Sequence, residues 1–314
     1  MAVQNLILRR AELYSAIRKF FSERNVLEVE TPVFSRSGNT DPFIQSLTAN
    51  FSLSVDNEDI FYAQTSPEFA MKRLLANGLD SIYQICKVFR LGEVGRRHNP
   101  EFSMLEWYRV GLSYHELMDE ISELLKVLGV SQGSRRISYN DLFYQHLEID
   151  VSNASVDQLK NCAEKFEIDV VGLEENLDDW LNLLLSHLIE PKLGIDAPLF
   201  VYDYPASQAA LANIREESYP IAERFELYLN GIEIANGYQE LTNGEFYKKR
   251  FYLENEKRLS RNMNNIPVQN NLLEDLQKGL PFCAGVALGL DRLLMHLCGI
   301  REIKDVLTFD FTNS

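Results

Sequence analysis

The sequence predicts an α+β fold in which a mostly antiparallel sheet is flanked by helices. Paired strand segments dominate the pattern, because short apolar runs are joined by polar or Asn-Gly turns. No regular alternation of strand and helix supports a parallel sheet. With 314 residues, of which 46% are hydrophobic, the chain is long enough to bury a large core.

The N-terminal part is expected to form a helix, a strand and a hairpin. Apolar side chains recur at helical spacing over residues 6–23. A strand is expected at residues 26–30, and Pro32 prevents it from continuing. Residues 51–55 and 60–63 flank a polar stretch, which is typical of a hairpin.

Two helices have clear start signals. Ser66 is expected to cap the first helix, with Pro67 at its first position. Ser113 and Glu116 predict a capping box for the second helix, which is expected to reach residue 128.

Residues 129–194 are expected to be mostly helical and carry no chemical motif. We interpret them as an insertion within one domain that covers residues 1–314. Beyond them, the segments 224–229 and 232–236 are joined by Asn-Gly at 230–231, a strong signal for a two-residue hairpin.

The composition limits the partners of the chain. Lys and Arg total 31 against 46 Asp and Glu, which gives a net charge of −15 at pH 7. This sign disfavours broad binding to a nucleic-acid backbone, although a local basic patch is compatible with it. The four cysteines are far apart and indicate neither a zinc site nor a disulfide framework. No apolar segment is long enough to span a membrane, so we expect a cytoplasmic protein with no membrane partner.

The segment 89–108 carries the strongest functional pattern, because it predicts strand, charged loop and strand with functional side chains at both ends. Arg90 closes the first strand. Phe102, Glu106 and Tyr108 recur at even spacing in the second strand, so they are expected to share one face. That face would combine a cation for a phosphate, an aromatic ring for a base and a carboxylate for an amine.

This segment, FRLGEVGRRHNPEFSMLEWY, resembles motif 2 of the class II aminoacyl-tRNA synthetases, and in particular their lysine-specific branch. Residues 26–32 (VLEVETP) resemble motif 1, and residues 285–292 (GVALGLDR) resemble motif 3. Residues 233–241 (EIANGYQEL) resemble a fourth block of the lysine branch. The resemblance covers residues 6–298 and implies the class II catalytic core, and four blocks in order are far more specific than one motif.

The resemblance implies a site that activates a carboxylic acid with ATP. Two anions must then meet, and cations are needed to offset their repulsion. Arg90 and Arg292 would be the catalytic residues: Arg90 would hold the α-phosphate and the substrate carboxylate, while Arg292 and His98 would approach the outer phosphates. Phe102 would stack on adenine. The expected ATP-binding residues are Arg90, Gly92, Glu93, His98, Asn99, Phe102, Glu233, Ile234, Gly289 and Arg292. The expected Mg²⁺ carboxylates are Glu226 and Glu233.

One position departs from the family pattern. The general motif 2 has a glutamate two residues after its arginine, where this chain has Gly92, with Glu93 one place later. The adenine contact therefore comes either from the Glu93 carboxylate or from the Gly92 backbone.

The implied amino-acid pocket needs anions for the ε-ammonium of a lysine-like substrate. Glu106, Glu240 and the Tyr108 hydroxyl would read this group, and Glu68 would take the backbone amine. Unpaired buried carboxylates would reject a neutral side chain. The expected substrate-binding residues are Ser66, Pro67, Glu68, Glu106, Tyr108, Asn236, Glu240 and Ala287.

Each of these residues also has an ordinary structural explanation. Arg292 is compatible with a salt bridge at a helix start, and Phe102 with a core position. Glu106 and Glu240 are compatible with solvated strand carboxylates, and His98 with a surface loop. Their joint occurrence in family order favours the site.

The resemblance begins near Met1, without the N-terminal OB-fold of a lysine tRNA ligase. Such a core resembles the elongation factor P lysine ligases, which attach lysine or (R)-β-lysine to that protein. Ser66 and Ala287, where the tRNA enzymes generally have alanine and glycine, favour (R)-β-lysine. The partners implied are ATP, lysine or (R)-β-lysine, Mg²⁺ and elongation factor P, without stable tRNA binding.

Three alternatives stay open: a lysine tRNA ligase without its anticodon domain, a non-catalytic amino-acid-sensing paralogue, and an asparagine synthetase of the same fold. Motif 1 implies a homodimer. Its candidate interface residues, which are equally compatible with a core, are Phe20, Phe21, Val26 and Val29.

Overall fold

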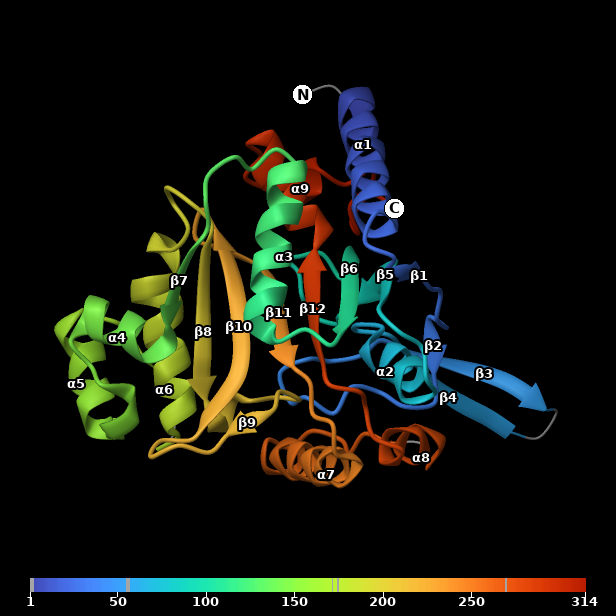
Figure 1. Ribbon diagram of the computed structural model, residues 1–314. Coiled ribbons are helices and arrows are strands. Elements are labelled where there is room, and N and C mark those ends of the chain that lie inside the picture. The colour runs from blue at the N-terminus through green and yellow to red at the C-terminus, as the bar shows by residue number, and fades with distance from the viewer. Residues whose placement is uncertain (1–2, 55–56, 171, 174, 269) are drawn as a thin grey trace. The chain divides into compact units, whose positions relative to one another are not determined.

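The computed structural model describes residues 3–54, 57–170, 172–173, 175–268 and 270–314. The chain divides into two compact units (Figure 1). Unit 1 comprises Met1–Val130 and Glu240–Ser314, and unit 2 comprises Ser131–Gln239. None of the helices in the described part of the chain is long and apolar enough to cross a membrane.

Unit 1 contains a sheet with the strand order β1-β5-β6-β12. Its strands are β1 (Leu27–Glu28), β5 (Ile82–Phe89), β6 (Glu101–Val110) and β12 (Cys283–Gly289). β1 runs parallel to β5, whereas β6 is antiparallel to both β5 and β12. The strand expected at 26–30 is confirmed in place but is shorter, because only two of its residues pair with β5.

A second, antiparallel sheet of unit 1 has the order β2-β4-β3. Its strands are β2 (Phe34–Ser35), β3 (Thr48–Ser54) and β4 (Asn57–Ala63). The two strands of the expected hairpin are confirmed, and residues 55–56 of its turn lie outside the described residues.

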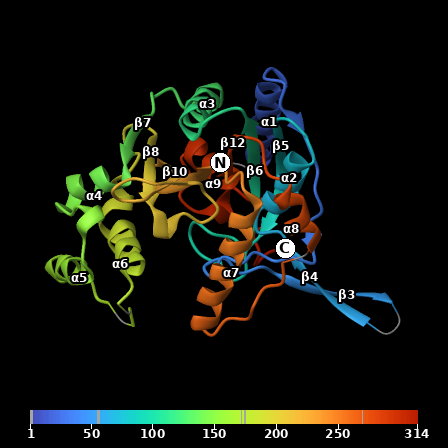
Figure 2. The same ribbon diagram turned by 60° about the horizontal axis from the view of Figure 1, so that its bottom comes forward.

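The helices of unit 1 are α1 (Val3–Ser22), α2 (Glu68–Ala76), α3 (Tyr114–Val127), α7 (Gly244–Ser260), α8 (Asn270–Gln277) and α9 (Leu290–Cys298). α3 packs against α1 and β12, while α8 packs against α2 and α7 (Figure 2). Phe20, Phe21 and Val26 are buried within this unit, so the core explanation holds for them in the single chain.

The start of α3 confirms the predicted capping box, in which Ser113 and Glu116 satisfy each other's backbone N–H groups. The start of α2 differs by one residue from the prediction. Pro67, rather than Ser66, occupies the N-cap position. The Ser66 hydroxyl still accepts a hydrogen bond from the Glu68 N–H at 3.1 Å, and its proton goes to a carboxylate instead.

The two faces of β6 carry different sets of side-chain contacts. Trp107 points toward α3, where its Nε1 donates to Glu120 at 3.0 Å. Glu106 and Tyr108 contact each other, with the Tyr108 hydroxyl donating to Glu106 at 2.7 Å. This contact between residues two apart confirms the predicted alternation and places Glu106 on the face opposite Trp107.

Unit 2 contains a sheet with the order β11-β10-β8-β7, and β9 also pairs with β10. Its strands are β7 (Arg135–Ser138), β8 (Leu199–Pro205), β9 (Ile214–Arg215), β10 (Ile221–Leu229) and β11 (Ile232–Gln239). Its α-helices are α4 (Tyr139–Leu147), α5 (Val156–Lys165) and α6 (Leu177–Leu184). The helical segment expected at 129–194 shares a core with the strands of this unit, in which Leu181, Val201 and Tyr228 are buried together.

The hairpin between β10 and β11 confirms the Asn-Gly prediction. Asn230 and Gly231 have φ values of 51° and 65°, as a two-residue turn of the primed type requires. A Cβ on Gly231 would lie 2.9 Å from the Pro191 carbonyl oxygen, so glycine is also needed for close packing.

Candidate active site

Arg90 lies directly after β5 and extends its pairing, because its N–H donates to the Pro100 carbonyl at 2.9 Å. Its guanidinium carbon lies 5.1 Å from the centre of the Phe102 ring. Gly92 has a φ of 83°, which turns the chain so that Glu93 approaches Arg90 at 3.5 Å. Phe102 is only partly buried, so its ring is not part of the core.

The loop after Gly92 brings His98 to Arg292. The distance between His98 Nε2 and Arg292 Nη2 is 2.7 Å, and Arg292 Nε also donates to the Arg97 carbonyl at 3.3 Å. Burial and the Arg292 charge lower the pKa of His98. A neutral imidazole can accept a hydrogen bond from the Arg292 guanidinium through Nε2.

The start of α9 is anchored by Asp291. Asp291 forms a 2.6 Å ion pair with Arg10 and accepts a 2.6 Å hydrogen bond from the Ser103 N–H. These contacts fix the helix start that carries Arg292. Gly289 precedes the helix and pairs with Met104 of β6.

Asn99 has a structural contact on each side of its amide. Its Nδ2 donates to the Glu101 carbonyl at 2.6 Å, and its Oδ1 accepts from the Phe311 N–H at 3.1 Å. Asn99, which is expected to line the nucleotide site, therefore connects the loop after Gly92 to the C-terminal segment at Phe311.

The acidic side chains expected to read the substrate form a network in unit 1. Glu106 accepts hydrogen bonds from the Tyr108 hydroxyl at 2.7 Å and the Ser66 hydroxyl at 2.5 Å. Glu106 and Glu240 are each only 2% exposed, so their interpretation as solvated strand carboxylates is wrong. Pro67 is buried beside Ser66.

Lys72 joins this network, although the sequence reasoning did not identify it. Its ammonium lies 2.6 Å from Glu68 and 2.6 Å from Glu240, and its side chain is fully buried. The available signal was its position four residues after Glu68, which places both on one face of α2. We call Ser66, Glu68, Lys72, Glu106, Tyr108 and Glu240 the carboxylate cluster.

Gly285 is a second position next to the carboxylate cluster that the sequence reasoning did not single out. A Cβ at this position would lie 2.4 Å from the Tyr108 ring and 2.5 Å from the Glu240 carboxylate. Only glycine lets these two side chains approach the strand so closely. Ala287, two residues later, pairs with Glu106 across the sheet.

Burial makes the negative charge of the carboxylate cluster costly. It raises the pKa of Glu106 to about 8, helped by the charge of Glu68. It raises the pKa of Glu240 to about 7, against the opposing effect of Lys72. A bound cation would favour the ionised carboxylates, so the cluster is suited to an ammonium group.

Unit 1 contains two electrostatic regions, the basic region around Arg90, His98 and Arg292 and the carboxylate cluster, and the two are adjacent. Arg90 Nε donates to the Thr65 carbonyl at 3.4 Å, and the next residue, Ser66, belongs to the carboxylate cluster. Phe102 and Glu106 share a face of β6 at a separation of four residues, roughly 13 Å along a strand. A nucleotide at Phe102 and an amine at Glu106 would therefore occupy neighbouring positions.

The remaining expected residues lie in unit 2. Glu226 of β10 pairs with Asn236 of β11, and Tyr228 pairs with Glu233. Ile234 is buried.

Glu226 accepts hydrogen bonds from four donors. They are the hydroxyls of Tyr204 at 2.7 Å and Tyr228 at 2.6 Å, Arg224 at 2.5 Å and Asn236 at 3.4 Å. These bonds fix the orientation of the Glu226 carboxylate, and its role as a Mg²⁺ ligand stays a prediction.

Two other groups in unit 2 do suit Mg²⁺. The Asn236 Oδ1 is buried without a hydrogen-bond partner among the described residues. Glu233 supplies a carboxylate on the same strand, and Mg²⁺ prefers one or two carboxylates together with phosphate oxygens and water. Among the described residues, no group of three or more His, Cys, Asp or Glu side chains is arranged to hold a metal ion by itself.

Comparison with known proteins gives consistent results. A family model for class II tRNA synthetases (D, K and N) matches residues 1–313. The chain is 45% identical over 305 residues to the elongation factor P–(R)-β-lysine ligase of Enterobacter sp. (strain 638), which covers 96% of this chain and 94% of that protein. Proteins of the same name from Pectobacterium atrosepticum and Yersinia enterocolitica are 43% and 45% identical, over 98% and 96% of this chain and 95% and 94% of theirs.

The match runs through both units and includes every residue of the two electrostatic regions. On this basis, the chain belongs to the class II tRNA synthetase family of the D, K and N type.

Proposed function

We propose that the chain is an ATP-dependent ligase that activates lysine or (R)-β-lysine as an aminoacyl-adenylate and transfers the acyl group to a lysine side chain of elongation factor P. The observation that carries this proposal is the pairing of opposite charges in unit 1. Arg90 lies against Phe102 at one end of the β6 face, and the buried Glu106 and Glu240 lie in the neighbouring carboxylate cluster. The names of the similar proteins support the same acceptor.

The first step forms a bond between a carboxylate oxygen of the substrate and the α-phosphorus of ATP, and pyrophosphate leaves. Both reactants are anionic, so fixed positive charge is needed in the transition state. Arg90 supplies positive charge for the α-phosphate, and the neighbouring Phe102 ring stacks on the adenine base. Arg292, with its geometry set by the neutral His98, supplies it for the outer phosphates.

The second step forms an amide. The neutral ε-amine of the acceptor lysine attacks the acyl carbon, AMP leaves, and the amine proton is lost to solvent. Desolvation of the acceptor lysine at the protein interface favours its neutral form. The carboxylate cluster holds the substrate's own ammonium groups protonated, which prevents them from reacting with the adenylate.

For Mg²⁺, we propose Glu233 as the direct carboxylate and the Asn236 side-chain oxygen as a further ligand, with Glu226 supporting β11 through its hydrogen bonds. When bound with ATP, the ion would screen the phosphate charges. Glu233→Gln is expected to raise the Mg²⁺ concentration for half-maximal activity roughly 10-fold. Glu226→Gln is expected to lower thermal stability more than it changes this concentration, and the reverse pattern contradicts the assignment.

The proposal includes a homodimer and no stable binding of tRNA. Ser66 and Ala287 are the reasons to expect (R)-β-lysine as the preferred substrate. ATP–pyrophosphate exchange with both lysine isomers tests this preference, and a clear preference for L-α-lysine contradicts it.

The acceptor is tested by mass spectrometry of elongation factor P after incubation with the enzyme, ATP and each lysine isomer. The expected result is the mass of one added lysyl or β-lysyl group on a lysine. Charging of purified tRNA, without modification of elongation factor P, would instead establish the truncated tRNA ligase. Absence of lysine-dependent exchange would favour the sensing paralogue.

A further inference from the structure

Lys72 raises a question that the proposed reaction leaves open. A substrate with ammonium groups needs anions, yet this site contains a fully buried ammonium of its own. A buried ion pair is a weak source of stability, because desolvation offsets most of its attraction. A methionine of similar size would fill the same space, so stability alone does not account for Lys72.

The charge count of the carboxylate cluster suggests an answer. Its six residues contain three carboxylates, of Glu68, Glu106 and Glu240, and one ammonium, of Lys72. When all are ionised, the net charge is two negative. Lysine and β-lysine each carry two ammonium groups, and their carboxylate belongs with Arg90. The cluster is therefore balanced for a diamine only when Lys72 is present.

We propose that Lys72 is a positioning and specificity-determining residue, which holds Glu68 and Glu240 in place through its two ion pairs and offsets one of the three carboxylate charges, so that the carboxylate cluster matches a substrate with two ammonium groups. This inference rests on the proposed function. The two 2.6 Å contacts join Glu68 in α2 to Glu240 after β11, which are far apart in the sequence. The Tyr247 ring, 5.3 Å from the ammonium, supplies a third contact from α7.

The titratable groups around Lys72 come from four elements and agree with this role. Glu68 lies on α2, Glu106 on β6, Tyr247 on α7 and Cys283 on β12, and Glu240 precedes α7. Burial alone would lower the pKa of Lys72, but the charges of Glu240 and Glu68 raise it well above its usual range. Lys72 in turn lowers the pKa of Glu240.

The test uses ATP–pyrophosphate exchange with lysine and (R)-β-lysine between pH 6 and 9. In Lys72→Met, Glu240 loses the cation that lowers its pKa while the charge of Glu68 still raises it, so Glu240 takes up a proton more readily. The KM for the amino acid is expected to rise roughly 10- to 100-fold at pH 7. The rise of kcat/KM with pH is expected to move upward by about one unit. The KM for ATP stays within about 3-fold of wild type, because the nucleotide residues are untouched.

Two further variants separate charge from packing. Lys72→Arg keeps the charge and is expected to retain the wild-type pH profile, even though its bulk raises KM. Lys278→Met makes the same change at an exposed lysine paired with Asp275. It is expected to alter neither the KM for the amino acid nor the pH profile of kcat/KM. If Lys72→Met does not fold, Lys72→Gln against Lys72→Arg provides the same comparison.

The proposal is overturned if Lys72→Met, or Lys72→Gln in its place, retains the wild-type KM for the amino acid and the wild-type pH profile. It is also overturned if the neutral variant and Lys72→Arg shift the pH profile equally, since only one of them loses the charge. Failure of the proposed function looks different. Wild-type protein would then show no exchange with either isomer, whatever residue stands at position 72.

Discussion

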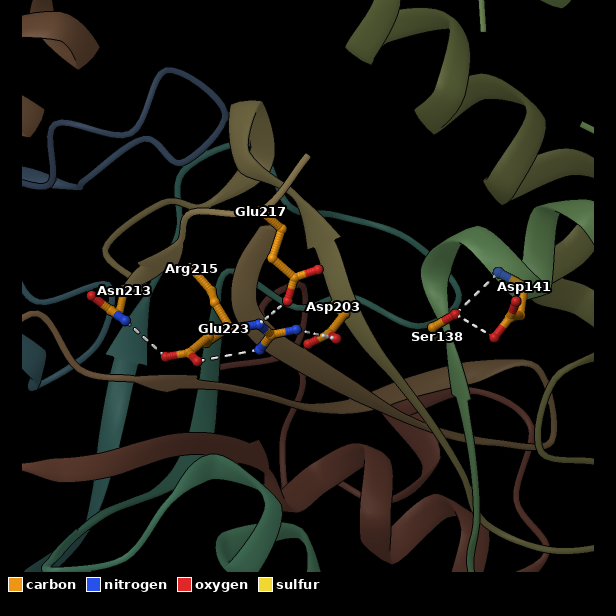
Figure 3. Close-up of polar contacts among 7 residues, drawn as sticks. All are labelled: Ser138, Asp141, Asp203, Asn213, Arg215, Glu217 and Glu223. Carbon is orange, nitrogen blue, oxygen red and sulfur yellow. Dashed lines mark hydrogen bonds and ion pairs between the residues drawn. The ribbon is translucent and has the colours of Figure 1, made fainter. Parts of the chain in front are cut away.

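Two clusters in the described part of this protein each combine three carboxylates with one cation, and they differ in burial. In unit 1, the carboxylate cluster surrounds Lys72, whose side chain is 0% exposed. In unit 2, Arg215 contacts Asp203, Glu217 and Glu223 at 2.8, 2.6 and 3.2 Å (Figure 3). The side chain of Arg215 is 35% exposed and that of Glu217 is 47% exposed.

The difference in burial suggests different roles for the two clusters: a structural role for the Arg215 group and substrate binding for the carboxylate cluster. The ion pairs of Arg215 are partly accessible to water, and that with Glu217 is the most exposed, so they contribute less than buried pairs and salt screens them more. In the carboxylate cluster the same charges are removed from water, which raises the pKa values of Glu106 and Glu240. Such an arrangement costs stability in the absence of a ligand, and this cost is expected where a charged substrate binds.

The largest expected effect concerns Arg90. Arg90→Lys removes the planar guanidinium beside Phe102, and we expect kcat/KM in ATP–pyrophosphate exchange to fall about 1000-fold. Arg215→Lys, in the group formed by Arg215, Asp203, Glu217 and Glu223, is the matched control and is expected to remain within about 2-fold of wild type. Similar losses in both variants would remove the distinction between the two regions.

Glu106→Gln is expected to raise the KM for lysine about 100-fold at pH 8, because one of the anions that receive the substrate is lost. It also changes how stability depends on pH. The folded-state pKa of about 8 lies above the ordinary value of 4.5, so wild-type stability decreases as pH rises between these values. Glutamine does not titrate, and the variant should therefore gain stability relative to wild type from pH 5 to pH 8.

This gain is measured by urea unfolding at both pH values and is expected to be on the order of 1–3 kcal/mol. A difference between variant and wild type that is independent of pH would show that Glu106 is not an ionisable buried group of this kind.

Gly285→Ala is expected to raise the KM for lysine about 10-fold, with a smaller effect on the KM for ATP. The new methyl group would lie 2.4 Å from Tyr108 and 2.5 Å from Glu240, so both side chains must shift. Gly133→Ala in unit 2 is the control, because its Cβ meets nothing within 4 Å. Wild-type kinetics for Gly285→Ala would show that these two side chains do not need their observed positions.

The smallest effect is expected at Glu217, the most exposed partner of Arg215. Glu217→Gln should change the free energy of unfolding by no more than about 0.5 kcal/mol, and this change should shrink in 1 M salt. Thermal unfolding at low and high salt measures it. A loss of several kcal/mol would mean that the Arg215 contacts are as important as the buried ones.

The sequence allowed prediction of the elements whose signals are local. The capping box of Ser113 and Glu116 and the turn at Asn230-Gly231 depend only on neighbouring residues, and both are confirmed. The short β1 was overestimated because its length depends on pairing with β5, which comes about fifty residues later.

The site could be predicted in part for the same reason. The alternation in β6 placed Glu106 beside Tyr108. Lys72 was missed because its contact with Glu240 joins residues 168 positions apart. The importance of Gly285 depends on two side chains that approach it from other segments, and no local pattern reports such an approach.

The most direct measurement is ATP–pyrophosphate exchange by the wild-type protein with lysine, (R)-β-lysine and norleucine, which lacks the ε-amine, across pH 6 to 9. Buried carboxylates that receive an amine predict exchange with at least one lysine isomer, a kcat/KM that rises as the carboxylate cluster ionises near pH 7 to 8, and no exchange with norleucine. Comparable exchange with norleucine, or a kcat/KM for lysine that does not change with pH, would contradict this account.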